Sequence, residues 1–157
     1  MAYAEKTEVA FEKSIAEIIG LIKRHRATSI GQFEGEADFA IQFMLGERLI
    51  RFRLPLPALS EMPTRNGNNV TLTASQRWDR LAQAKRSRAR ALLLVIKAKL
   101  ESVESGIETT EQAFLANVVM ADGFTVYERI AQPIALEYQT GKPSASAGLL
   151  PPPADRS

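Results

Sequence analysis

Apolar residues at helical spacing come first along the chain. Over the range from about Glu12 to Arg26, one stripe of a helix would carry four isoleucines, Ile15, Ile18, Ile19 and Ile22. The S-x-x-E spacing of Ser14 and Glu17 is typical of a capping box, and the basic residues at 23–26 suit the negative end of a helix dipole. We therefore predict a first helix over this range, after a frayed or extended segment at residues 1–8.

Alternation at strand spacing follows. From Asp38 to Leu45 and from Arg48 to Leu54, apolar residues alternate with other residues at a period of two, as in half-buried strands. The Gly46-Glu47 dipeptide joins these two strands as a tight hairpin, and Pro55 ends the second because proline cannot donate to a ladder. A weaker strand precedes them from Thr28 to Glu34. The pattern predicts a three-stranded antiparallel sheet.

A long helix from Thr73 to Ile107 is the structural spine that the pattern predicts. Thr73 or Ser75 can cap its start, and Gly106 is expected to end it. At about 100° per residue, its apolar side chains form one stripe. The members of this stripe are Trp78, Ala82, Ala89, Leu92, Leu93, Ile96, Leu100 and Val103. A three-stranded sheet needs a cover, and this helix is expected to provide it.

Leu94 and Val95 lie off that stripe, so residues 92–96 are apolar almost all round the helix. A helical segment of this kind is either buried on several sides or used in association. Either the helices that follow in the chain cover it, or a second copy of the chain packs along it to form a homodimer.

Two shorter helices complete the predicted elements. The first runs from Thr109 or Thr110 to about Met120, and the second from Thr125 to Thr140, with Pro133 as a kink or a boundary. The predicted fold class is α+β: an N-terminal helix, a three-stranded antiparallel sheet, a long central helix packed on the sheet, and two shorter C-terminal helices. This single domain covers residues 1–140. The Pro- and Ser-rich tail at 141–157 is expected to be disordered because it cannot bury enough apolar surface.

The composition excludes several kinds of chemistry. The 157-residue chain has no cysteine, which excludes disulfides, thiolate zinc sites and a cysteine nucleophile. Its one histidine, His25, stands among basic residues at a predicted helix end, and its acids and glycines are scattered. We can therefore name no metal site and no phosphate-binding loop. We expect a binding protein with no cofactor, and not an enzyme.

The hydropathy pattern also bears on location. No apolar run reaches the roughly 18 residues that a membrane span needs. Acidic residues occupy the N-terminus, where a signal peptide would be basic and then apolar. We expect a cytoplasmic protein that makes no membrane contact.

The distribution of charge is more informative than its total of +2. From Arg77 to Lys99 the chain has eight basic residues and one acid, a window of +7, so the remainder sums to −5. Acids dominate from Glu101 to Glu137, where Arg129 is the one base. Because clustered Arg and Lys neutralise phosphates, the basic window predicts contact with nucleic acid.

The candidate nucleic-acid-binding residues are Arg77, Arg80, Lys85, Arg86, Arg88 and Arg90 on the long helix, with Arg51 and Arg53 on the third strand. On the helix, Arg86, Arg90 and Lys97 lie on one flank of the apolar stripe, and Arg77, Arg88 and Lys99 on the other. The alternative is a solvated helix whose long side chains cover the edges of the core. Arg51 and Arg53 share the strand face opposite Phe52, where they either extend a basic surface or meet solvent. Trp78 either stacks on a base or packs in the core.

Several short sequence motifs, taken together, carry a resemblance to a known group of proteins. They are Ala4-Glu5-Lys6-Thr7, Ser14-x-x-Glu17-Ile18, Ile50-Arg51-Phe52-x-Leu54-Pro55-Leu56-Pro57, the run from Ala91 to Glu101, and the run from Gly106 to Glu111 followed by Phe114-Leu115-Ala116. In these motifs the chain resembles a group of small proteins encoded by tailed bacteriophages and prophages. The resemblance covers most of residues 4–130. It implies a phage setting and carries no established activity.

Together, charge and resemblance favour a phage-type accessory protein in the cytoplasm of the host cell. We expect it to bind nucleic acid non-specifically through the basic central helix, with DNA favoured over RNA, in phage DNA replication or recombination. The alternative is a protein-interaction module that docks on a host or phage protein. Its contact surface would be the apolar girdle from Leu92 to Ile96 or the acidic C-terminal helices.

Overall fold

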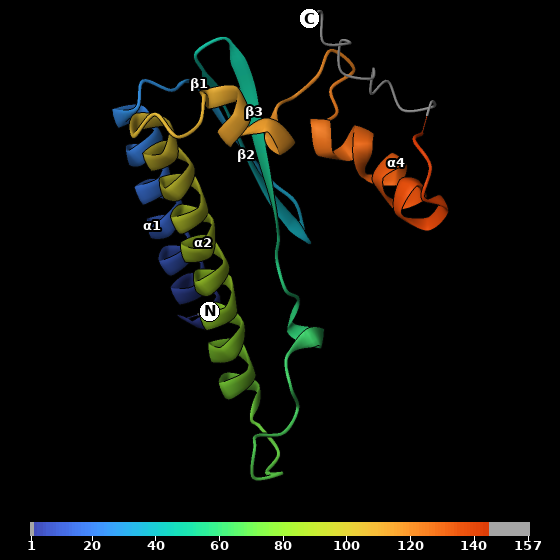
Figure 1. Cartoon of the computed structure of the whole chain (residues 1–157). Coiled ribbons are helices and arrows are strands. Elements are labelled where there is room, and N and C mark those ends of the chain that lie inside the picture. The colour runs from blue at the N-terminus through green and yellow to red at the C-terminus, as the bar shows by residue number, and fades with distance from the viewer. Residues whose placement is uncertain (1, 145–157) are drawn as a thin grey trace, which may run out of the picture.

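The computed structural model describes residues 2–144, with the side chains of residues 11–144. Its elements follow the predicted order and confirm the predicted α+β class (Figure 1). In chain order they are the helix α1 (Ala2–Arg24), the strands β1 (Thr28–Glu34), β2 (Asp38–Leu45) and β3 (Arg48–Pro55), and the helices α2 (Ala74–Glu104), α3 (Thr110–Ala113) and α4 (Val126–Thr140). Two 3₁₀ turns, η1 (Leu59–Glu61) and η2 (Leu115–Asn117), lie in the connections.

Helix α1 begins about ten residues earlier than predicted. It starts at Ala2, so the frayed segment expected at residues 1–8 is wrong from Ala2 onward. Residues 2–13 contain no glycine or proline and are rich in alanine, glutamate and lysine, which favour a helix. The capping-box interpretation of Ser14 is also wrong, because Ser14 lies inside the helix and is only 3% exposed. The helix ends at Arg24, two residues before the predicted Arg26.

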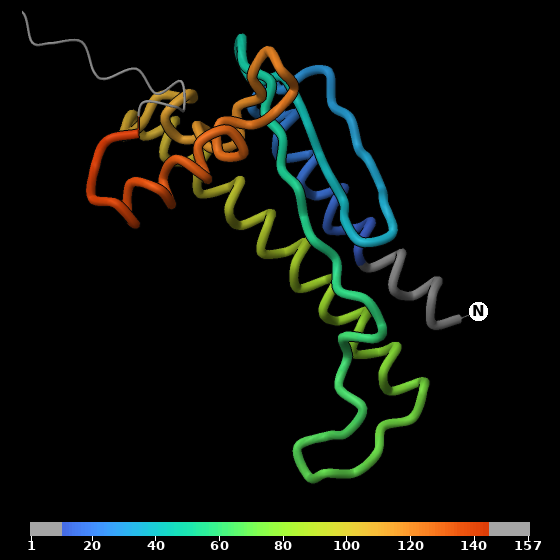
Figure 2. The backbone as a smooth tube through the Cα atoms, turned by 90° about the vertical axis from the view of Figure 1, so that its right-hand side faces the viewer, coloured from blue at the N-terminus to red at the C-terminus, as the bar shows by residue number. Residues whose placement is uncertain are grey.

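The three strands form one antiparallel sheet in the order β1-β2-β3. Its register pairs Ile41 with Phe52 and Phe43 with Ile50, and these four buried side chains share one face. Helices α1 and α2 both cover this face, whereas the sequence singled out α2 alone as the cover. Figure 2 shows the two helices side by side and running in the same direction. The ring of Phe114 closes the core edge-on to Phe43 and Phe52, with centroids 6.4 and 6.2 Å away.

Helix α2 is the predicted spine and has the predicted ends. At its start the Thr73 hydroxyl accepts the Gln76 N–H, while the Gln76 side chain accepts the Thr73 N–H. Gly106 follows the helix at a φ of 72°, a conformation that costs glycine little. One stripe is buried, comprising Leu81, Ala89, Leu92, Ile96 and Leu100. Trp78 lies near the start of α2, away from the sheet, and stays 36% exposed.

The apolar girdle of α2 is only partly covered. Leu94 and Val95 are 65% and 45% exposed. Their coverage by the helices that follow was one of two predictions, and the structure contradicts it, because α3 packs beside the C-terminal end of α2 and leaves these two side chains exposed. Association along α2 remains the other prediction.

The segment after α2 departs from the predicted helix. Helix α3 is a single turn, and beyond η2 the backbone of Val118 pairs with Ile50 on β3. The Val119 N–H donates to the Leu49 carbonyl at 2.8 Å. The prediction of a helix to Met120 is wrong because the edge of β3 offers backbone partners, and β-branched valines suit an extended strand.

Helix α4 lies on the other side of the sheet from α1 and α2 (Figure 1). The Thr125 hydroxyl caps its start, the helix continues through Pro133 as one element, and Gly141 ends it in a left-handed conformation. None of its residues is buried. The disordered tail was predicted for residues 141–157, of which 145–157 lie outside the described part of the chain.

Candidate nucleic-acid interface

The basic residues on one flank of α2 form hydrogen bonds to main-chain carbonyl groups of neighbouring segments. These three residues, Arg77, Arg88 and Lys99, each donate to a main-chain carbonyl. Arg77 Nη2 reaches the Leu59 carbonyl at 3.0 Å, Arg88 Nη1 the Pro55 carbonyl at 2.8 Å, and Lys99 Nζ the Ala113 carbonyl at 2.7 Å. The Leu59 carbonyl lies in η1, the Pro55 carbonyl at the end of β3, and the Ala113 carbonyl in α3. Arg77 and Arg88 therefore have a structural role that their charge alone did not reveal.

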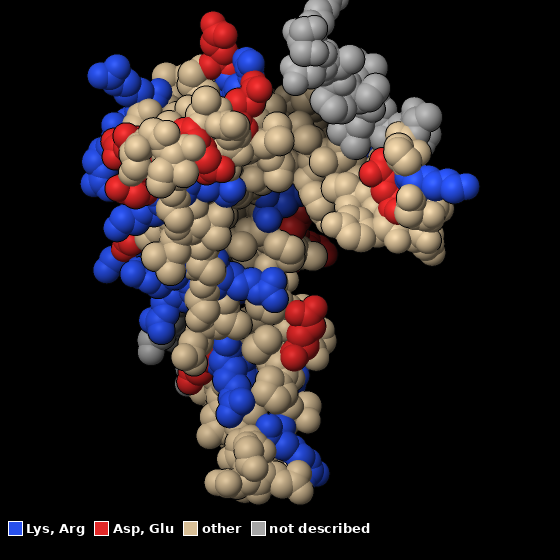
Figure 3. Space-filling model, viewed as in Figure 1, with Lys and Arg blue, Asp and Glu red and all other residues tan. Residues whose placement is uncertain are grey.

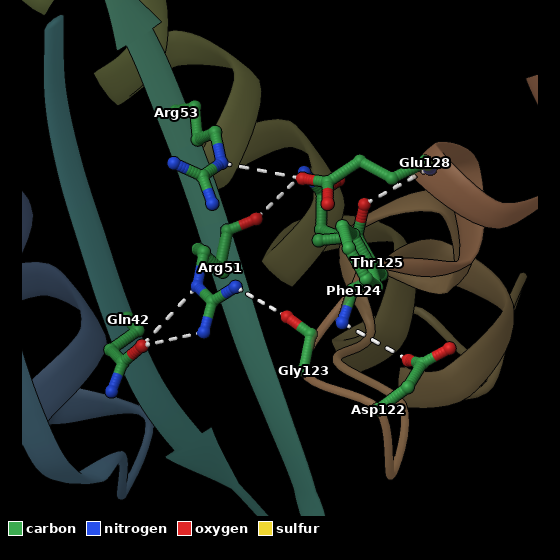
Figure 4. Close-up of polar contacts among 9 residues, drawn as sticks. Gln42, Arg51, Arg53, Asp122, Gly123, Phe124, Thr125 and Glu128 are labelled. Atoms are coloured by element: carbon green, nitrogen blue, oxygen red, sulfur yellow. Dashed lines mark hydrogen bonds and ion pairs between the residues drawn. The ribbon is translucent and has the colours of Figure 1, made fainter.

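Arg51 and Arg53 hold the C-terminal segment on the outer face of the sheet (Figure 4). Arg51 Nη1 donates to the Gly123 carbonyl at 2.8 Å, and its other two nitrogens share the Gln42 side-chain oxygen at 3.3 Å. Arg53 Nε lies 3.3 Å from a carboxylate oxygen of Glu128. The two arginines share the expected face, but the loop before α4 and the first turn of α4 engage them there. They do not form an open basic surface.

Lys85 and Arg80 stand apart from each other and from these contacts. Lys85 lines a hollow on the sheet side of α2 together with Glu12, Glu34 and Glu36. Three carboxylates around one ammonium group disfavour a phosphate at that place. Arg80 is exposed near the start of α2, and helical spacing turns it away from Arg86.

The remaining two predicted residues, Arg86 and Arg90, converge with basic residues of α1. Between α1 and α2 lie two hollows that share Glu17 and Arg90 and so form one continuous surface. We call this surface the helix-pair groove. It is lined by Lys13, Ser14, Glu17, Gly20, Leu21 and Arg24 from α1, and by Arg86, Ser87, Arg90, Leu93, Leu94 and Lys97 from α2.

The helix-pair groove opens away from the sheet. On α1, Lys13, Glu17 and Arg24 recur near multiples of a helical turn, on the side opposite Ile18 and Ile22, which are buried in the core. At 1.5 Å per residue, the groove from Lys13 to Arg24 is about 16 Å long. Figure 3 shows basic side chains gathered along the left margin of the molecule, where α1 and α2 run.

The electrostatics of the groove are strongly positive. Five basic residues line it, namely Lys13, Arg24, Arg86, Arg90 and Lys97, against one acid, Glu17, which leaves a net charge of +4. Glu17 Oε2 lies 3.6 Å from Arg90 Nη1. Because both side chains are about half exposed, this ion pair is weak and can yield to a phosphate.

Three of these basic residues, Lys13, Arg24 and Lys97, were not among the sequence candidates. A signal for Lys97 existed, since helical spacing puts it on one flank of α2 with Arg86 and Arg90. The α1 residues could be grouped by spacing in the same way, but no pattern within α1 shows that its basic side faces the basic flank of α2. That meeting depends on how the two helices pack.

Comparison of the chain with family models, with curated proteins and with solved structures finds no match. Among the side chains of residues 11–144, no group of three or more histidine or acidic residues is placed to hold a metal ion. No helix in the described part of the chain is long and apolar enough to cross a membrane. The case for an interface therefore rests on the geometry and charge of the helix-pair groove.

Replacing Arg51 by Met is expected to loosen the segment from Val118 to Val126 without unfolding the protein. The variant keeps the aliphatic stem but loses the hydrogen bond to the Gly123 carbonyl, a loss of about 1 kcal/mol. Amide hydrogen exchange at Val119 and Val126 should quicken about fivefold. The control is Arg48→Met, which removes the exposed contact with Glu111 and should leave these two amides unchanged. Equal exchange in both variants would contradict the anchoring role of Arg51.

Proposed function

We propose that the protein binds nucleic acid in the helix-pair groove, through phosphate groups and without sequence specificity. The observation that carries this proposal is the convergence of five basic residues from two helices on one groove that contains a single acid. The sequence resemblance supports the setting of a phage-type accessory protein that acts on DNA, in replication or recombination, in the host cytoplasm.

The chemistry of the groove favours backbone contacts over base contacts. Apart from Glu17, its polar lining is Lys, Arg and Ser, residue types that bind phosphate oxygens, and phosphates carry no sequence information of their own. None of the residues that line the groove is aromatic, so it offers no platform on which a base could stack. Four or five phosphate contacts predict a slope of log affinity against log salt of about −3 to −4.5.

Reversing two charges in the groove should strongly weaken the binding of nucleic acid. Arg86→Glu combined with Arg90→Glu removes two phosphate contacts and adds two repulsive charges. We expect at least about 30-fold weaker binding at 0.1 M salt. Gel-shift titration of single-stranded and double-stranded DNA, and of RNA, measures this, with circular dichroism to verify folding.

The control for this variant must carry the same change in net charge. Arg65→Glu combined with Lys142→Glu does so, with both residues outside the helix-pair groove. Binding close to that of the wild type is expected. Equal losses in the two double variants, or no shift by the wild type at micromolar protein and low salt, would overturn the proposal.

Glu17→Gln should strengthen binding. The substitution keeps the shape of the side chain, removes the one acid of the groove and frees Arg90 from its ion pair. One further phosphate contact is worth about fivefold in affinity at 0.1 M salt and should steepen the salt slope by about one. The steepening separates a new contact from a general gain in stability. An unchanged slope would show that nucleic acid does not reach Glu17.

A protein-interaction function is favoured by one observation on α4. Tyr127, Ile134 and Tyr138 recur at spacings of seven and four residues, and they are 59%, 39% and 89% exposed. An apolar seam at this spacing suits the groove of a partner protein. Ile134→Ser with Tyr138→Ser should then abolish capture of a host or phage protein from a lysate, while Arg86→Glu with Arg90→Glu retains it. The reverse pattern would exclude α4 as the contact.

A further inference from the structure

The two edges of the sheet differ. The edge at β3 is partly covered, because Val118 pairs with Ile50 and the Val119 N–H donates to the Leu49 carbonyl. Within the described residues, β1 pairs on one side only, with β2, and most of its residues are exposed. A free edge strand presents unpaired N–H and carbonyl groups, which bind another strand unless they are protected.

Apolar side chains line this free edge on both faces of the sheet. On the outer face, Phe33 is 55% exposed, and its ring leans along the strand over Gly31, where an added Cβ would meet it at 3.3 Å. On the inner face, a hollow between β1 and α1 is lined by the apolar residues Phe11, Ile15, Ala16 and Ile19 of α1, together with the polar residues Glu12, Gln32 and Glu34. An incoming strand would therefore gain apolar contacts above and below its backbone.

Charge identifies the strand that fits. The two residues Lys23 and Arg26 precede β1, and Glu34, Glu36 and Asp38 lie at its end or beyond it; all five are exposed. The edge is thus basic at one end and acidic at the other. An antiparallel copy of the same segment places each acidic end beside the basic end of the other copy. Self-pairing of this edge is therefore electrostatically complementary.

We propose that β1 pairs antiparallel with β1 of a second copy of this chain, centred on Gln32, to form one six-stranded sheet. This register sets Phe33 of each copy directly opposite Gly31 of the other, so the ring that leans over Gly31 in one copy lies beside the ring of the other copy. The two Phe33 rings then lie diagonally across the symmetry axis, within reach of each other. The irregularity of β1 between Thr28 and Gly31 lies just outside the paired centre at 31–33.

The dimer has a consequence for the proposed function. In this dimer a two-fold axis perpendicular to the continuous sheet relates the two copies. Both pairs of α1 and α2 therefore cover the same face of the sheet. The two helix-pair grooves then open on one side of the dimer and can contact one nucleic acid molecule together, which raises avidity. This consequence rests on the proposed function, whereas the dimer itself does not.

The test measures mass in solution without nucleic acid. Sedimentation equilibrium of the full chain at micromolar concentration should give twice 17.3 kDa. The double variant Lys23→Glu with Arg26→Glu should be a monomer, and so should the double variant Glu34→Lys with Glu36→Lys. In a dimer of either variant, like charges would meet at both ends of the paired β1 strands. An equimolar mixture of the two variants should restore the dimer. Wild type at the monomer mass, or a mixture that stays monomeric, would overturn the proposal.

A second pair of variants distinguishes this interface from association along α2. Phe33→Ser should weaken the dimer at least tenfold, while Leu94→Ser, at a residue 65% exposed on α2, should leave it unchanged. The opposite result would assign the interface to the girdle of α2 and exclude the β1 edge. Since DNA is absent from these measurements, their outcome is independent of the gel-shift result.

Discussion

The packing of α1 beside α2 on one face of the sheet is the contact on which the rest of the molecule depends. Ile18 and Ile22 of α1 and Ile96 of α2 enter the same core as Phe43 and Ile50 of the sheet. Burial of this apolar surface is the main favourable term for a domain of this size. It fixes the two helices parallel and in contact, and the outer surface between them follows from that arrangement. The helix-pair groove is thus a by-product of the core.

The same packing gives the basic residues on the two flanks of α2 different surroundings and different roles. The flank that faces the β3 connection and α3 meets backbone carbonyls, so Arg77, Arg88 and Lys99 hold loops in place. Such carbonyls lie close to apolar surface and need donors, and a long basic side chain can reach them while its stem covers the core edge. The flank that faces α1 meets other basic residues and a single acid. Charge density along a helix therefore does not by itself identify a binding surface.

Much of the fold could be predicted from the sequence. Alternation located β2 and β3, and the cap at Thr73 with Gly106 located α2, because these signals are local and each is set by a few neighbouring residues. One prediction failed because a distant partner decides the conformation: Val118 and Val119 are extended because the edge of β3 lies beside them. The early start of α1 has a local cause, because residues 2–13 contain no glycine or proline and favour a helix.

The sequence by itself determined the order of the elements, the apolar stripe of α2 and the excess of basic residues on it. Only the tertiary structure decided which of these residues share a surface. Helix packing places Arg86 and Arg90 in the same groove as Lys13 and Arg24, which lie more than sixty positions away in the chain. Arg51, by contrast, donates a hydrogen bond to the Gly123 carbonyl of the C-terminal segment. The physical reason is that spacing fixes which side of a helix or strand a residue occupies. What that side faces is fixed by the burial of apolar surface elsewhere in the molecule.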